Sequence, residues 1–173
     1  MEDWNIKIWN IGKMEDWNDG LKNNGVVLSH YSIIPFAHEE SQEEAMKIGK
    51  RVVQTEMAPK AIGPYSQAIQ AGNFLFLSGQ IPLDPKTGEL VKGDIRQQTK
   101  QVLNNLEGVL GSEKLEMKDV VKVTIFLRDI GNFNQVNDVY ATYFPSSPPA
   151  RSTVQVAKLP RDAEIEIEAI ALI

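Results

Sequence analysis

The sequence predicts an α+β domain of two layers, in which two helices pack on one face of a mixed β-sheet. Residues 48–173 alternate between short strand patterns and two helical patterns, in the order β-β-β-α-β-α-β-β. Each helical pattern has one apolar stripe, so each helix is expected to bury a single face. A strand with alternating apolar and polar residues is typical of a sheet with two different faces.

Each element is expected from its own local pattern. The pair Gly72-Asn73 between two strand patterns indicates a tight hairpin. Asp94 is a suitable N-cap for the first helix, and Gly111 follows its apolar stripe. Prolines from Pro145 onward stop the second helix. The expected strands are 51–54, 67–71, 74–80, 119–127, 152–156 and 163–172, and the expected helices are 94–110 and 132–144.

Residues 1–47 differ from the rest of the chain. They contain all three tryptophans and both histidines, and nine acidic residues against four lysines give them a net charge of −5. The pentapeptide Met-Glu-Asp-Trp-Asn occurs twice, starting at Met1 and Met14, but two copies are too few for a solenoid. No helical or strand period is sustained. We therefore expect an irregular N-terminal extension.

A second interpretation of this extension is that it is translated leader. Residues 42–45 can be encoded by a purine-rich stretch that resembles a bacterial ribosome-binding site, just upstream of Met46. On this hypothesis the natural protein begins at Met46. The intact mass of protein from its native source distinguishes the two interpretations, because a mass that matches all 173 residues would exclude the shorter form.

Composition argues against several classes of protein. The chain has no cysteine, so it has no disulfide, thiolate nucleophile or zinc–thiolate site of its own. It has no run of roughly 18 apolar residues and no secretory signal or arginine-rich presequence, so we expect a cytoplasmic protein that does not contact membranes. Residues 48–173 hold fourteen acidic and fourteen basic residues, which disfavours a nucleic-acid partner.

The candidate chemical groups of the domain are carboxylates, arginine, hydroxyls, backbone groups and water, because residues 48–173 contain neither histidine nor cysteine. Glu164, Glu166 and Glu168 alternate along the last strand and share one face. A solvated outer face is the simplest interpretation, and the sharper one is that one acid faces a cavity and holds a water. Arg151 follows a stiff proline segment, which suits a preorganised fork for a carboxylate.

Three other segments hold candidate residues, although each segment alone more often has a structural role. The turn Gly63-Pro64-Tyr65-Ser66 is rigid and presents the phenol of Tyr65. Gly79, which follows Ser78, permits another group to approach the backbone closely. Asn137 lies on the second predicted helix, where a solvent-facing amide is the simpler interpretation. The sequence holds no phosphate-binding loop, metal-ligand cluster or Ser–His–Asp set, so we expect no metal and no cofactor.

Four ordered motifs resemble the RidA/YjgF family, whose members are 2-iminobutanoate/2-iminopropanoate deaminases. The resemblance covers about residues 48–173. It implies a chorismate-mutase-like fold and a homotrimer with sites in the clefts between subunits, which agrees with a sheet whose second face needs a cover. The motifs are Ala61–Ala68, Ser78–Pro82, Pro149–Val154 and Ile165–Ala169.

The resemblance also implies roles for residues. Arg151 would bind the substrate carboxylate, and Glu166 would position the hydrolytic water. The implied activity is hydrolysis of reactive 2-imino acids and enamines to 2-keto acids and ammonia, which protects pyridoxal-dependent metabolism. Thr153 stands where several members have cysteine, at a point where the family uses backbone groups. The remaining substrate-binding positions implied are Tyr65, Ser78, Gly79 and Asn137.

Two alternatives from other functional classes remain open at this point. Some relatives in the family are described as translation inhibitors or endoribonucleases, so the first alternative is a protein that acts on RNA. The second is a non-catalytic trimer that binds small ligands in the same cleft. The small molecules expected as partners in the main interpretation are imino and keto acids.

Overall fold

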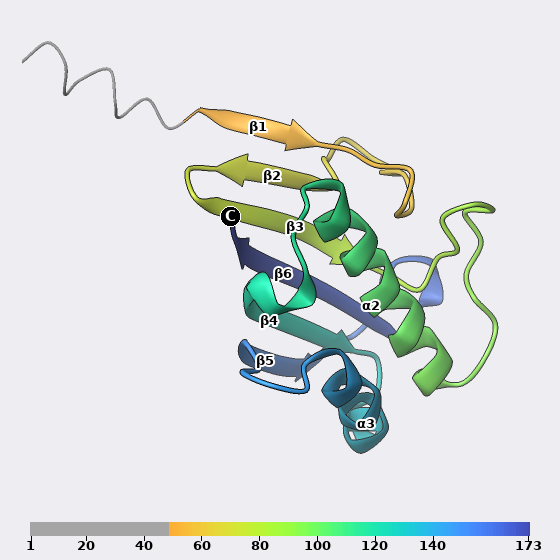
Figure 1. Ribbon diagram of the computed structural model, residues 1–173. Coiled ribbons are helices and arrows are strands. Elements are labelled where there is room, and N and C mark those ends of the chain that lie inside the picture. Colours follow the sequence, from red (N-terminus) through yellow and green to blue (C-terminus); the bar gives the residue numbers. More distant parts are fainter. Residues whose placement is uncertain (1–48) are drawn as a thin grey trace, which may run out of the picture. The chain divides into compact units, whose positions relative to one another are not determined.

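The computed structural model describes residues 49–173, which form a six-stranded sheet with two α-helices on one of its faces (Figure 1). The strand order is β1-β2-β3-β6-β4-β5, and all neighbours are antiparallel except β4 and β5. The predicted two-layer α+β fold and element order are confirmed, whereas the predictions for residues 1–47 lie outside the described residues. No helix within residues 49–173 is long and apolar enough to cross a bilayer.

The bounds of the elements agree with the predicted ones to within a few residues. The strands are β1 (Lys50–Val53), β2 (Ala68–Ala71), β3 (Phe74–Gln80), β4 (Val120–Leu127), β5 (Ala150–Gln155) and β6 (Ile165–Leu172). The helices are α2 (Ile95–Ser112) and α3 (Phe133–Tyr143), with short 3-10 helices at η2 (Met117–Asp119), η3 (Ile130–Asn132) and η4 (Pro160–Asp162).

Local side chains define where α2 begins and how β2 turns into β3. The Asp94 carboxylate accepts a hydrogen bond from the backbone N–H of Gln97 at 2.9 Å, and Gln97 Oε1 accepts one from the backbone N–H of Asp94 at 3.0 Å. This reciprocal pair satisfies donors that have no partner inside the helix. Gly72 in the hairpin has φ of 57°, a conformation that glycine adopts without steric cost.

The hydrophobic core lies between the two helices and one face of the sheet. Ile125 of β4 and Ile167 of β6 are fully buried, as are Val102 and Leu103 on the predicted apolar stripe of α2. Burying such a side chain fully contributes about 1.5–3 kcal/mol. The alternation of apolar residues along β4 and β6 therefore decides which face of the sheet the helices cover.

This alternation is shifted at the beginning of β4. The sequence pattern groups Val121 with Val123, yet Val121 is 42% exposed and Val120 is buried instead. The pairing of β4 with β6 is irregular between Val120 and Lys122. A bulge adds a residue to one strand and so reverses the side-chain order beyond it, which explains the difference.

Neither α2 nor α3 lies on the opposite face of the sheet (Figure 1). A row of apolar side chains crosses this face in register, from Val52 through Ile69 and Phe76 to Ile170. Val52 is 58% exposed and Phe76 is 45% exposed. Because monomeric proteins rarely expose large contiguous apolar patches, this face is a candidate contact surface.

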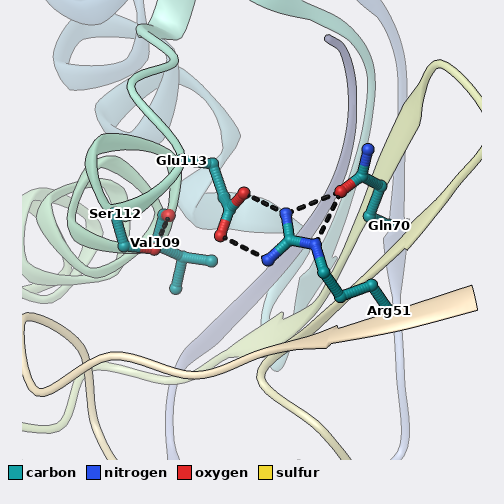
Figure 2. A network of polar contacts seen from close by, with 5 residues as sticks. All are labelled: Arg51, Gln70, Val109, Ser112 and Glu113. Atoms are coloured by element: carbon teal, nitrogen blue, oxygen red, sulfur yellow. Dashed lines mark hydrogen bonds and ion pairs between the residues drawn. The ribbon is translucent and has the colours of Figure 1, made fainter.

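A polar network ties the edge strand β1 to the end of α2 (Figure 2). Arg51 Nη1 donates to Glu113 Oε1 at 3.2 Å, and Arg51 Nη2 donates to the second carboxylate oxygen of Glu113. Arg51 Nε also donates to Gln70 Oε1 on β2 at 2.9 Å. The planar guanidinium can satisfy both partners at once, so it orients β1 against both its neighbouring strand and the helix.

Candidate active site

A pocket of about 440 Å³ opens where β3 and β6 meet the loop of residues 55–66. Tyr65, Ser78, Gly79 and Glu166, four of the seven predicted site residues, line it. Its remaining wall is largely apolar, and a few convergent polar groups in an apolar hollow are typical of small-molecule sites. Its other lining residues are Pro59, Lys60, Ile62, Gln67, Gln80, Ile81, Leu83, Pro160 and Glu168.

A larger hollow of about 970 Å³ lies between α2 and α3, but none of the predicted site residues lines it. Its wall includes the ion pair between Arg96 and Asp138, 2.7 Å apart, so these charges already neutralise each other. No group of three or more His, Asp or Glu side chains within residues 49–173 is placed to hold a metal ion. The smaller pocket is therefore the better candidate for chemistry.

A β-bulge shapes the floor of the smaller pocket. Leu77 pairs with Ala169 and Gln80 pairs with Ile167, so β3 has one more residue than β6 between these two pairs. The extra residue falls at positions 78–79 and takes backbone groups out of the regular ladder. A Cβ atom added to Gly79 would lie 2.8 Å from Cδ of Glu166. Any larger residue here would therefore displace the Glu166 carboxylate, which lies directly against the backbone of β3.

Glu166 is half-buried in this pocket. Burial raises the pKa of its carboxyl group, and the nearby negative charge of Glu168 raises that pKa further. Glu164 has an ion pair with Arg128 at 2.9 Å, and neither Glu166 nor Glu168 has one within residues 49–173. Of the three acids predicted to share a face, Glu166 is thus the one that combines partial burial with an unpaired carboxylate.

The loop wall of the pocket is held in place by a buried side chain, Gln67. Its Nε2 donates to the backbone carbonyls of Thr55, Ala58 and Pro59 at 3.0, 3.2 and 2.8 Å. Its Oε1 accepts a hydrogen bond from the backbone N–H of Thr55 at 2.7 Å. Gln67 is 2% exposed. Sequence reasoning missed this role, because nothing in the sequence indicates which carbonyls a glutamine will meet.

The two hydroxyl groups of the pocket are already engaged within the loop. The Tyr65 hydroxyl accepts a hydrogen bond from the backbone N–H of Ile62 at 3.3 Å, which closes the turn that presents the ring. Ser78 Oγ donates to the backbone carbonyl of Ser66 at 2.7 Å. A ligand at Ser78 would therefore meet its backbone or the free lone pairs of its oxygen rather than a free O–H donor.

The other three predicted site residues, Arg151, Asn137 and Thr153, lie where β5 meets α3. The guanidinium carbon of Arg151 lies 4.6 Å from the centroid of the Tyr140 ring and 5.7 Å from that of Phe133. Asn137 follows Phe133 by four residues and precedes Tyr140 by three, so all three share one stripe of α3. Thr153 follows Arg151 by two residues and shares its face of β5.

Arg151 is without an ion-pair partner in the part of the chain that the structure describes. Within residues 49–173, no carboxylate forms an ion pair with its guanidinium. Burial raises the pKa of Tyr140 to about 12, although the positive charge of Arg151 opposes this shift. Phe133 and Tyr140 belong to the apolar stripe of the second predicted helix, which the sequence indicates only as a face that packs into the core. The two rings lie four residues before and three residues after Asn137, on the helix that precedes the strand of Arg151. This spacing is the signal that could have identified them as neighbours of the arginine.

The two groups of predicted residues lie on opposite faces of the sheet. Arg151 pairs with Val123, whose side chain is buried against the helices. Glu166 pairs with Phe126, three residues later on β4, and therefore points to the other face. Strand β4 also separates β5 from β6, which places their backbones about 9–10 Å apart. With Arg151 held against α3, a small molecule in one chain cannot touch both side chains.

Residues 55–173 match the family model described as Endoribonuclease L-PSP. The chain belongs to the RidA/YjgF family. This confirms the resemblance that the four motifs carry.

Individual RidA/YjgF relatives match over the same region. A RutC family protein of Pyrococcus horikoshii is 60% identical over 122 residues, which are 70% of this chain and 97% of the relative. The 2-iminobutanoate/2-iminopropanoate deaminase of Mus musculus is 47% identical over 123 residues, 71% of this chain and 91% of the relative. The crystal structure of the YjgF gene product of E. coli is 45% identical with a TM-score of 0.68, and the match covers 70% of this chain and 98% of that one.

We predict that Gly79→Ala impairs the imino-acid hydrolysis expected for this family while the fold persists. The added Cβ would displace the Glu166 carboxylate, so kcat/KM should fall by about tenfold or more. Gly111→Ala is the matched control, because a Cβ added there would meet no atom within 4 Å beyond its chain neighbours and the backbone of its own helix. Both variants are compared by steady-state kinetics and thermal unfolding. An unchanged kcat/KM for Gly79→Ala would contradict the close approach of Glu166.

Proposed function

We propose that this protein hydrolyses reactive 2-imino acids and their enamine precursors to 2-keto acids and ammonia. Relatives named 2-iminobutanoate/2-iminopropanoate deaminase or Reactive Intermediate Deaminase A, 47–50% identical to this chain, support the proposal. The observation that carries it is an arginine that has no acidic partner within residues 49–173, together with a half-buried carboxylate of raised pKa. A 2-imino acid needs one group for its carboxylate and another for the attacking water.

Arg151 would bind the carboxylate of the substrate. Two parallel N–H···O bonds from one guanidinium match the two oxygens of a carboxylate, and each charge-assisted bond contributes roughly 1.5–3 kcal/mol. The centroids of two aromatic rings lie 4.6 and 5.7 Å from the guanidinium carbon, and no carboxylate within residues 49–173 pairs with it, so its N–H donors stay available for a ligand. The neighbouring Asn137 and Thr153 would line the same end of the site.

Glu166 would orient a water molecule and accept a proton from it as the water attacks the carbon of the C=N bond. A C–O bond forms, the π electrons of the imine move to nitrogen, and the nitrogen takes up a proton. Collapse of this tetrahedral intermediate breaks the C–N bond and releases ammonia and the 2-keto acid. The raised pKa makes Glu166 a stronger base than an ordinary glutamate. Imines hydrolyse readily in water, so modest acceleration is sufficient.

The two half-sites would be joined by assembly into a homotrimer. The α3–β5 edge of one subunit would face the Glu166 pocket of the next, which brings Arg151 and Glu166 to one substrate. Two features support this arrangement: the exposed apolar row on the open face of the sheet, and the position of β5 at the sheet edge. A cyclic assembly repeats the same contact at each interface.

An activity on RNA is the alternative, and the family description as an endoribonuclease favours it. The equal numbers of acidic and basic residues in the domain argue against it, because affinity for nucleic acid depends mainly on the neutralisation of phosphates. Titration of RNA at several salt concentrations would distinguish the two activities. Binding that weakens steeply with salt would favour the alternative.

We predict that Arg151→Ala lowers kcat/KM for 2-iminobutanoate on the order of a hundredfold or more, because two charge-assisted hydrogen bonds are lost. An amino-acid oxidase generates the imine in situ, semicarbazide competes for it, and release of the keto acid is followed. Arg96→Ala, which removes an exposed arginine from α2, should retain activity. Activity that survives in Arg151→Ala would contradict its role in carboxylate binding.

We predict that kcat/KM falls as the pH decreases through the pKa of Glu166, because the ionised carboxylate is the base. Burial and Glu168 both raise this pKa, so the decrease should occur above the ordinary value of about 4.3. Glu168→Gln removes one cause and should shift the decrease to lower pH. Glu166→Gln should lower kcat more than it raises KM. If Glu166→Gln left kcat unchanged, the residue would have no part in the reaction.

We predict that two inactive variants restore activity to each other when their subunits are mixed. A trimer that contains both Arg151→Ala and Glu166→Gln subunits has one cleft with both native side chains, so random mixing should restore about a quarter of the native clefts. The measurement compares activity before and after joint refolding of the two variants. If both side chains acted within one subunit, mixing would restore no activity.

A further inference from the structure

The arginine assigned to carboxylate binding is held by aromatic rings, and we infer that Tyr140 is the residue that positions it. This inference rests on the proposed function. The Arg151 guanidinium carbon lies 4.6 Å from the centroid of the Tyr140 ring, closer than to the ring of Phe133 at 5.7 Å. A guanidinium within about 6 Å of a ring centroid is attracted by the electrons of the ring face.

The Tyr140 ring is a rigid support. Its side chain is 5% exposed and belongs to the main hydrophobic core. The rings of Tyr140 and Phe144 lie with their centroids 4.5 Å apart, which fixes the Tyr140 ring from a second direction. A charged group that rests on a ring packed into the core loses little further freedom when a ligand binds.

An aromatic support suits this ligand better than an acidic one. A glutamate or aspartate beside Arg151 would occupy the N–H donors that a substrate carboxylate needs. A ring attracts the cation through its face and does not accept the N–H bonds in the guanidinium plane. Tyr140 would thus orient Arg151 and leave its N–H donors free for the substrate carboxylate.

The hydroxyl group of Tyr140 takes no part in this role. Its Oη atom is buried and has no hydrogen-bond partner within residues 49–173. It is enclosed by its own chain, so a neighbouring subunit has no open path to it. Removal of an unsatisfied buried hydroxyl is neutral or stabilising. Tyr140→Phe should therefore retain both the fold and the support for Arg151, whereas Tyr140→Leu removes the ring.

The test measures binding of 2-ketobutanoate to the full-length protein by calorimetry, alongside deaminase kinetics. Tyr140→Leu should weaken binding roughly three- to thirtyfold and raise KM with little change in kcat, because Glu166 is untouched. Tyr140→Phe should bind as the native protein does. The matched control is Tyr143→Leu, which removes another tyrosine ring from α3. The hydroxyl of Tyr143 donates a hydrogen bond to Asn104, and its ring is not one of those that lie beside Arg151.

The outcomes separate this inference from the proposed function. Native affinity in Tyr140→Leu, together with lost binding in Arg151→Ala, would overturn the positioning role and leave the proposed function in place. Equal weakening in Tyr140→Phe and Tyr140→Leu would assign the effect to the hydroxyl and also overturn it. Native binding in Arg151→Ala would overturn the proposed function itself. If Tyr140→Leu fails to fold, Tyr140→Met takes its place, and native affinity in that variant would overturn the positioning role.

Discussion

Side chains along β4 and β6 alternate between two environments, and this alternation sets the positions of the core, the pocket and the arginine. Ile125 and Ile167 enter the core because their face is the one that the helices cover. Their neighbours on the other face are left to line the pocket or the open surface. A shift of one residue in either strand would exchange the two sets, so the hydrophobic pattern that stabilises the fold also selects which acids line the pocket.

The regular hydrogen-bond ladder of the sheet is interrupted by two bulges, one in β3 and one in β4. The bulge in β3 brings Gly79 against the Glu166 carboxylate, so a backbone irregularity creates part of the site. The bulge near the start of β4 only changes which valine is buried. Both follow from one extra residue in one strand, but the first lies beside a partly buried carboxylate and the second lies at the end of the core.

Periodicity and capping were sufficient to predict all six strands and both helices, because strands and helices depend on short-range pattern. The bulge that exposes Val121 was not predictable, since it depends on the partner strand. Four predicted site residues meet in one pocket because three lie on the adjacent strands β3 and β6 and Tyr65 lies on the loop that leads into β2. The opposite orientation of Arg151 and Glu166 depends on the parallel register of β4 and β5, which no local pattern encodes. The support of Arg151 by Tyr140 is likewise a contact between elements.

The bonds from Gln67 to the loop of residues 55–66 have a consequence for the rate at which a ligand can enter. Three carbonyls and one N–H of this loop are tied to a single buried amide before any ligand is present. This part of the pocket wall therefore does not have to be ordered when a ligand arrives, and the conformational entropy of that step is not lost on binding. A ligand that entered at this wall would be limited by diffusion and by desolvation of the pocket, and would not have to wait for residues 55–59 to become ordered.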